Sequence, residues 1–392
     1  MIKFLELSLY GVLLASLLGP SIRFPLPLPL NLYLSDLFLC LMIIVLLFHT
    51  KQVFLLIKRD PVTKAFLVLT LFFGISMLIS PLKLTGFEFF VSGMYLLRYF
   101  AYFFVYISAI YLKNKSKNFQ YRINLPVSII IFGFISLGWL QYFLYPDLRN
   151  LSYLGWDPHY KRIFALILDP NYFGIILVLL FLYIIAREKI DLKGLFLRSF
   201  LLLTIGFTYS RSTYLAFFAA LIYYAGMVNK LKLFLFSSLI LIPMLILLPR
   251  PGGVGVQLER LFSAKERLAN WQNAVKTISS YPFSGIGFNS LRFIDETTGG
   301  NNEKGLRNNS GGGVDNSFLF VAVTSGLTGL GIYIYFLFML YKNTDTLGKS
   351  VLLASVVHSM FLNSMFFVFV LIWLWTITAL GSKLKVKENS EL

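Results

Sequence analysis

The sequence predicts an all-α polytopic membrane protein, on the evidence of its composition, its long apolar runs and the placement of its charges. Of the 392 residues, 57% are hydrophobic and only 14% are charged, and the mean hydropathy is +0.74. Soluble domains carry charge on about a quarter of their residues, so this composition is typical of a protein that lies in the bilayer. The 40 Phe and 22 Tyr residues suit helices that contact lipid and the membrane interface.

The apolar runs predict about 12 transmembrane helices. A helix needs roughly 20 apolar residues, or about 17 when short, to cross the hydrocarbon core. Runs of this kind lie at 3–19, 31–48, 64–80, 89–112, 125–145, 170–186, 195–209, 213–228, 231–248, 315–341, 349–363 and 365–381. The two closely spaced pairs of runs, within 195–228 and 349–381, are the least certain spans, so the predicted number of transmembrane helices is about 10–12.

Lys and Arg predict the orientation of the bundle. They concentrate in every second connection and in the C-terminal tail, at 51–64, 113–122, 187–198, 230–232, 342–349 and 383–387. By the positive-inside rule these connections and both termini are cytoplasmic. The rule also accounts for the net charge of +17, so nucleic acid is not expected as a partner.

The chain divides into four segments on this topology. Residues 1–249 hold transmembrane helices one to nine, 250–314 form a large extracytoplasmic loop, 315–381 hold helices ten to twelve, and 382–392 form a cytoplasmic tail. The loop is the one long hydrophilic stretch, so we expect polar chemistry in water on that face. Apolar residues at helical spacing between Leu258 and Ile278 predict an amphipathic helix within the loop, lying on the membrane surface.

Motifs for cofactor and metal chemistry are absent from the sequence. There is no P-loop, no GxGxxG after a strand, no HExxH and no acidic DxD pair in an outer loop. Cys40 is the only cysteine, and His49, His159 and His358 are too scattered to suggest a metal cluster. We therefore expect a site without metal or cofactor, in which arginines supply the positive charge.

Two arginines beside or within apolar runs are candidate ligands of an anion. Arg211 sits at the outer tip of a tight helical hairpin, where it could simply snorkel and anchor the hairpin. Charges at such positions are rare, however, and a guanidinium at the lipid boundary suits a diphosphate, which it binds bidentately. Arg98, near the outer end of its span, also requires a polar or phosphate partner.

The predicted loop helix carries a second pair of candidates, Arg267 and Trp271. By charge alone, Arg267 is explained by the solvated or headgroup-facing side of this helix, which is its more ordinary role. A catalytic role is the alternative.

Polar residues at helix starts and on a late span form a third group. Asp315 and Asn316 begin the tenth span, where Asp315 is equally well explained as a helix N-cap or as a general base. Asn171 opens the sixth span after Asp169, and the capping role of Asp169 does not explain the amide, so Asn171 is a candidate site residue. His358 lies near the same face, where an interhelical hydrogen bond is the more ordinary role.

Several short blocks follow one another along the second half of the chain. They are Arg162 with Asp169-Pro170-Asn171-Tyr172-Phe173-Gly174, Thr208 to Ala216, Glu266 to Trp271, Pro282 to Gly287, Asp315 to Leu319, and Ser325 to Gly329. In order and spacing these blocks resemble the O-antigen ligase/polymerase family of integral membrane glycosyltransferases. The resemblance covers roughly residues 160–365.

The resemblance implies a GT-C-like helical bundle in the bacterial cytoplasmic (inner) membrane. Such enzymes take glycan from a polyprenyl diphosphate carrier on the outer face and transfer it to an acceptor hydroxyl. Undecaprenyl-diphosphate-linked glycan and the lipid bilayer are then the partners, and a chain-length regulator is a further candidate. The resemblance implies that Arg211 and Arg267 bind the diphosphate and stabilise the charge that develops on it. We further expect Asp315 to act as the base, and the site to be lined by Arg98, Arg162, Asn171, Trp271, Asn316 and His358.

One departure from the family pattern decides between two activities. Ligases of this family typically carry His where this chain has Asp315. We therefore expect a polymerase that joins lipid-linked repeat units of O-antigen, capsule or exopolysaccharide, with an O-antigen ligase of lipopolysaccharide synthesis as the alternative. A flippase for the same lipid-linked glycan is the alternative from another class, but it should show internal repeats and mid-bilayer polar residues, and we find no repeat.

Overall fold

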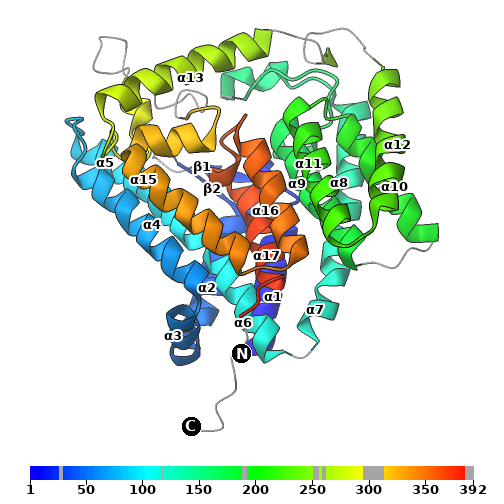
Figure 1. Cartoon of the computed structure of the whole chain (residues 1–392), viewed down its shortest axis with the longest axis horizontal. Coiled ribbons are helices and arrows are strands. Elements are labelled where there is room, and N and C mark those ends of the chain that lie inside the picture. The colour runs from blue at the N-terminus through cyan, green and yellow to red at the C-terminus, as the bar shows by residue number, and fades with distance from the viewer. Residues whose placement is uncertain are drawn as a thin grey trace.

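Helices account for most of the computed structural model (Figure 1), which describes residues 1–25, 30–116, 118–154, 156–187, 192–249, 256–257, 262–294 and 313–384. In the first half they are α1 (Ile2–Ala15), α2 (Leu34–Leu47), α3 (Thr50–Arg59), α4 (Pro61–Leu78), α5 (Gly86–Tyr102), α6 (Phe104–Lys115), α7 (Phe119–Arg122), α8 (Asn124–Leu144) and α9 (Pro170–Arg187). In the second half they are α10 (Leu192–Gly206), α11 (Arg211–Met227), α12 (Leu231–Leu247), α13 (Phe262–Ser280), α15 (Ser317–Lys342), α16 (Thr346–Ser359) and α17 (Val368–Leu380).

A helical membrane protein is confirmed, whereas the number of spans is not. Each of the predicted apolar ranges contains a helix, but in the described chain only 5 helices are long and apolar enough to cross a membrane. They are Pro61–Leu78, Gly86–Lys115, Phe119–Leu144, Pro170–Arg187 and Ser317–Lys342, and the pair α2 and α3, bent by 98°, would make up to 6. About 12 crossings therefore stay a prediction.

A small sheet departs from the all-α expectation. Strand β1 (Arg23–Pro25) pairs antiparallel with β2 (Asn31–Tyr33), so the span expected from residue 31 begins as a strand. The helix starts only at Leu34, where the carboxylate of Asp36 accepts a hydrogen bond from the backbone N–H of Tyr33 at 2.7 Å. Such a cap satisfies an N–H group at the helix end and fixes where the helix begins.

The centre of the bundle is formed by α9, α16 and α17. All 13 residues of α17 are buried, as are 14 of the 18 residues of α9. A helix that is apolar on every side belongs inside a bundle. The buried α16 packs against α9, α11 and α17, so its end near His358 and its start near Thr346 are both enclosed by other helices.

Helix α15 is broken at Gly326, which has φ 66° and ψ −177°. The segment from Pro282 to Gly287 fills the break. The N–H groups of Ile286 and Gly287 donate to the carbonyls of Val323 and Thr324 (3.0 and 2.9 Å), and the N–H of Leu327 donates to the Pro282 carbonyl (2.7 Å). The backbone groups freed by the break are thus paired again, which buried backbone requires.

Helix α13 lies across one end of the bundle (Figure 1), at the position where the sequence predicts a loop helix. The chain after it does not stay in water as expected, because Ile286 and Phe288 are 0% and 2% exposed and pack into the core. These two apolar residues stabilise the fold by leaving water, and only part of the loop is hydrophilic. Its Gly/Asn-rich tract (295–312) and residues 385–392 of the tail lie outside the described residues.

Candidate functional site

A pocket of about 460 Å³ lies between α11, α13 and the chain that follows α16. Its lining is Arg211, Ser212, Leu215, Arg267, Leu268, Trp271 and Phe361. It therefore brings together three candidates that are far apart in sequence, Arg211, Arg267 and Trp271. Leu215 and Leu268 are 50% and 54% exposed, so the pocket has an apolar margin at the surface of the bundle. Two like-charged guanidiniums over an apolar surface favour a ligand that is both anionic and lipidic.

Arg211 is the first residue of α11 and follows a tight turn. Tyr209 in this turn has φ 49°, a left-handed conformation that costs energy for a residue with a side chain. Arg162 stabilises the turn through two hydrogen bonds. Its Nε donates to the Thr208 carbonyl at 2.8 Å, and one of its Nη atoms donates to the Tyr209 carbonyl at 3.4 Å. Arg162 is 3% exposed. It is thus placed to fix the position of Arg211, and its expected contact with substrate stays a prediction.

Strained backbone is concentrated beside this turn. Among described residues other than glycine, six have positive φ, and four of them (Lys161, Ala165, Leu168 and Tyr209) flank Arg162 or Arg211. Strain of this kind persists where the surroundings impose it, and it clusters at functional sites.

Asn171 and Asp169 start α9 and complete the support of Arg162. The amide oxygen of Asn171 accepts from Arg162 at 3.1 Å, and the Asp169 carboxylate caps the helix by accepting from the N–H groups of Asn171 and Tyr172 (2.6 and 3.1 Å). Burial raises the pKa of Asp169, but the nearby His159, the Tyr172 N–H and the charge of Arg162 outweigh it and lower the pKa to about 2. Asp169 is therefore charged at neutral pH and stabilises the start of α9 as a negatively charged helix cap.

Asp157, His159 and Asp169 form a cluster that the sequence did not suggest, since we considered histidines alone. Their potential ligand atoms lie within 4.8 Å of one another. A metal would bind Nε2 of His159, which faces Asp169 at 3.8 Å, and Nδ1 would then carry the proton. Nδ1, however, faces a guanidinium nitrogen of Arg162 at 3.4 Å, which can only donate. Metal binding through Nε2 would therefore place the Nδ1 proton against the guanidinium of Arg162, and we assign no step to a metal.

Asp315 ties α13 to α15 and approaches the pocket. Its N–H donates to the amide oxygen of Asn270 at 3.0 Å, and its carbonyl accepts from the indole of Trp271 at 3.2 Å. Its carboxylate lies 3.9 Å from Nε of Arg267 and is 50% exposed, against 21% for the Arg267 side chain. A half-exposed carboxylate beside a cationic pocket can accept a proton from an incoming hydroxyl.

Asn316 is the N-cap of α15, not Asp315. The Asn316 amide oxygen accepts from the N–H groups of Phe318 and Leu319 (2.9 and 3.1 Å), and its amide nitrogen donates to the Met360 carbonyl at 3.0 Å. Helix capping therefore no longer explains Asp315, while it does explain Asn316. The side chain of Asn316 also holds α15 against the chain that carries Phe361, while its expected contact with substrate stays a prediction.

His358 and Arg98 do not line the pocket. His358 is 0% exposed, and its two ring nitrogens lie 2.6 Å from Oγ of Ser364 and 3.2 Å from Oγ of Ser212. It therefore positions Ser212 next to Arg211 and forms the expected interhelical hydrogen bond. Arg98 is paired with Asp36, and its guanidinium lies 4.4 Å from the ring centre of Tyr33. Both have protein partners in the structure, and their expected contact with substrate stays a prediction.

The comparisons with known proteins bear on these residues directly. Residues 196–334 match the family model described as O-Antigen ligase. This segment is similar to the O-antigen ligase/polymerase family. The matched range contains Arg211, Arg267 and Asp315, and it runs from α10 into α15. No curated protein matches the chain.

The match gives the site a chemical setting. The O-antigen ligase family acts on lipid-linked glycans in the membrane, and the long apolar helices of this chain agree with an integral membrane protein. The break in α15 also joins two of the blocks that carried the resemblance, Pro282 to Gly287 and Ser325 to Gly329. Contacts between blocks explain why they occur together in one chain.

Sequence reasoning missed several residues of the site. Ser212 and Asn270 lie inside the family blocks, and their hydroxyl and amide groups were signals beside the two arginines. Leu215 and Leu268 also lie inside these blocks, but their side chains gave no signal of their own, and neither did Phe361, because apolar residues in a membrane protein are ordinary. Only the folded structure, in which α11 and α13 both line the pocket, shows that they form its wall.

Proposed function

We propose that this protein polymerises lipid-linked oligosaccharide repeat units on the outer face of the inner membrane. The single observation that supports this proposal most is the pocket in which Arg211 and Arg267 face each other over an apolar margin. Undecaprenyl diphosphate has the matching chemistry, since its diphosphate is anionic and its polyprenyl chain is apolar. The orientation of the pocket toward the outer face rests on the positive-inside rule.

The reaction is a displacement at the anomeric carbon of the donor glycan. The acceptor sugar hydroxyl forms the new C–O bond, the bond from the anomeric carbon to the diphosphate oxygen breaks, and undecaprenyl diphosphate leaves with the electron pair. Arg211 and Arg267 neutralise the charge that develops on the leaving diphosphate, which is usually the largest catalytic contribution. Asp315 takes the proton of the attacking hydroxyl and later releases it to water.

Asp315 also favours polymerisation over ligation. Its carboxylate is half exposed and Asn316 supplies the helix cap, which supports Asp315 as the base where related ligases typically have His. An O-antigen ligase is the second candidate, because the matched family model bears that description. In that case the acceptor would be a lipid or another glycan, and the pocket would bind the same donor.

Substitution of the arginines tests the proposal in cells that depend on this chain for long-chain polysaccharide. We expect Arg211→Ala and Arg267→Ala to abolish the long chains at normal protein levels, and Arg211→Lys to fail as well, because an ammonium cannot reproduce the bidentate fork. Arg149→Ala is the matched control, since Arg149 pairs with Asp147 in an exposed loop, at 2.7 Å and outside the pocket. Normal chains in both alanine variants would disprove the assignment.

A further inference from the structure

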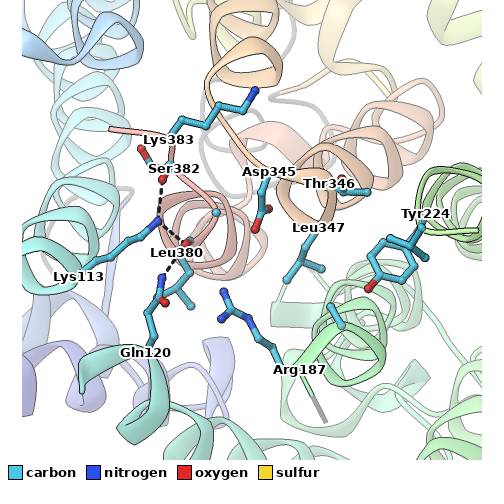
Figure 2. A pocket seen from close by; sticks show the side chains of 13 residues that line it. Lys113, Gln120, Arg187, Tyr224, Asp345, Thr346, Leu347, Leu380, Ser382 and Lys383 are labelled. Carbon is cyan, nitrogen blue, oxygen red and sulfur yellow. Dashed lines mark hydrogen bonds between the residues drawn. The ribbon is translucent and has the colours of Figure 1, made fainter. Parts of the chain in front are cut away.

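A second cavity lies at the opposite end of the bundle from the candidate site. Its volume is about 550 Å³, and it opens where α9, α11 and α17 end and α16 begins (Figure 2). Helix α9 starts at Pro170 beside the candidate site and reaches this cavity at Arg187. At 1.5 Å per residue this is a separation of about 27 Å, so the two sites are distinct.

Three cations and one carboxylate line this second cavity: Lys113, Arg187, Lys383 and Asp345. The ammonium of Lys113 is already hydrogen-bonded to the backbone, because it donates to the carbonyls of Leu380 and Ser382 at 2.8 and 2.6 Å. The ammonium of Lys383 donates to the Lys342 carbonyl at 3.0 Å and points away from the centre (Figure 2). Lys113 and Lys383 therefore contribute positive potential, but most of their hydrogen-bonding capacity is used.

Arg187 is different, because its guanidinium enters the cavity and makes no hydrogen bond or ion pair within the described chain (Figure 2). Asp345 is across the cavity and does not pair with it. The Asp345 carboxylate instead caps α16 by accepting from the N–H of Gly348 at 2.9 Å. Within the described residues, none of the five N–H donors of Arg187 is used, so they can serve a ligand.

The walls around Arg187 narrow the choice of ligand. Val228, Leu347 and Leu380 give the cavity an apolar side, and the excess of positive charge selects an anion. Guanidinium groups bind phosphate through two parallel hydrogen bonds. Basic pockets between transmembrane helices on the cytoplasmic side are suited to phospholipid headgroups.

We propose that this cavity binds a phosphate group through Arg187, and that its place at the helix ends favours the headgroup of an anionic phospholipid of the inner leaflet. The binding is independent of the glycosyl transfer proposed above, since none of its residues lines the first pocket.

Native mass spectrometry of the full-length protein in detergent tests this proposal. Phosphatidylglycerol, phosphatidylcholine and inorganic phosphate are titrated separately onto the wild-type protein, Arg187→Gln and Arg59→Gln. Arg59 is the matched control, because it is an exposed arginine at a helix end outside the cavity. Arg187 has no protein partner in the described chain, so we expect Arg187→Gln to keep the wild-type melting temperature, measured in parallel.

We expect phosphatidylglycerol to bind the wild-type protein and Arg59→Gln with equal affinity, and to bind Arg187→Gln about tenfold more weakly. Phosphatidylcholine should bind the wild-type protein more weakly than phosphatidylglycerol does. Arg187-dependent binding of inorganic phosphate without lipid binding would support the phosphate site but identify a soluble ligand as its source. Equal binding of every probe to the wild-type protein and Arg187→Gln would overturn the proposal.

Discussion

Replacing Gly326 by alanine tests whether the break in α15 is needed for the stability of the fold and for the activity of the site. Gly326 has φ 66° and ψ −177°, a region that is essentially restricted to glycine and that costs about 1–3 kcal/mol for other residues. A Cβ here would lie 2.2 Å from the Phe283 carbonyl oxygen and 2.7 Å from the Ser284 nitrogen, which are backbone atoms and cannot rotate away. Overpacking of this kind costs about 1–3 kcal/mol more. We therefore expect Gly326→Ala to lose about 2–6 kcal/mol of stability.

The assay compares Gly326→Ala with Gly331→Ala, in which the added methyl meets nothing within 4 Å in the same helix. Melting of the detergent-purified proteins, followed by tryptophan fluorescence, should show a lower midpoint for Gly326→Ala alone. Because the segment from Pro282 to Gly287 connects α13 to the break, the same variant should also shorten the polysaccharide made at equal protein level. A wild-type midpoint and wild-type chains in Gly326→Ala would refute the proposed link between the break and the site.

Three further predictions concern the chemistry of the site and its support. Asp315→Asn should lower the transfer rate by about 10²–10⁴-fold, with donor binding retained in an equilibrium assay, and an unchanged rate would exclude Asp315 as the base. Because the pKa of Asp169 is lowered to about 2, its charged form stabilises the folded protein by about 2 kcal/mol. This contribution is present above about pH 4 and is lost as the pH falls toward about 2. Asp169→Asn should remove this acid dependence from a curve of unfolding free energy against pH. Chelation with EDTA should leave polymerisation by purified protein unchanged, and loss of activity restored by a divalent cation would show that the cluster around His159 binds metal after all.

Hydropathy predicted the positions of the helices well, because the length of an apolar run is a local property. It did not predict the break at Gly326, which depends on a segment about 40 residues earlier in the chain that supplies the missing hydrogen-bond partners. The strand at Asn31–Tyr33 was missed for a related reason, since strand pairing with Arg23–Pro25 competes with the helix that its hydropathy favours.

The candidate site was predictable in part. Arg211 and Arg267 were identified through the family blocks. Charge alone favoured an ordinary interfacial role for Arg267 and left the two roles of Arg211 equally open, and only the folded structure shows that both residues line one pocket. The capping alternative for Asp315 was wrong by one residue, because a sequence cannot locate a helix end that closely. His358 was singled out as a polar residue in a span, but its burial and its bond to Ser212 become visible only in the packed bundle.

The central claim is tested most directly with purified protein in liposomes that contain an undecaprenyl-diphosphate-linked repeat unit. With donor accessible on the side of the Arg211 pocket, we predict that the glycan lengthens and that undecaprenyl diphosphate is released in step with each new linkage, and that Arg211→Ala does neither. Movement of the repeat unit across the membrane without lengthening, or lengthening that persists in Arg211→Ala, would contradict the account.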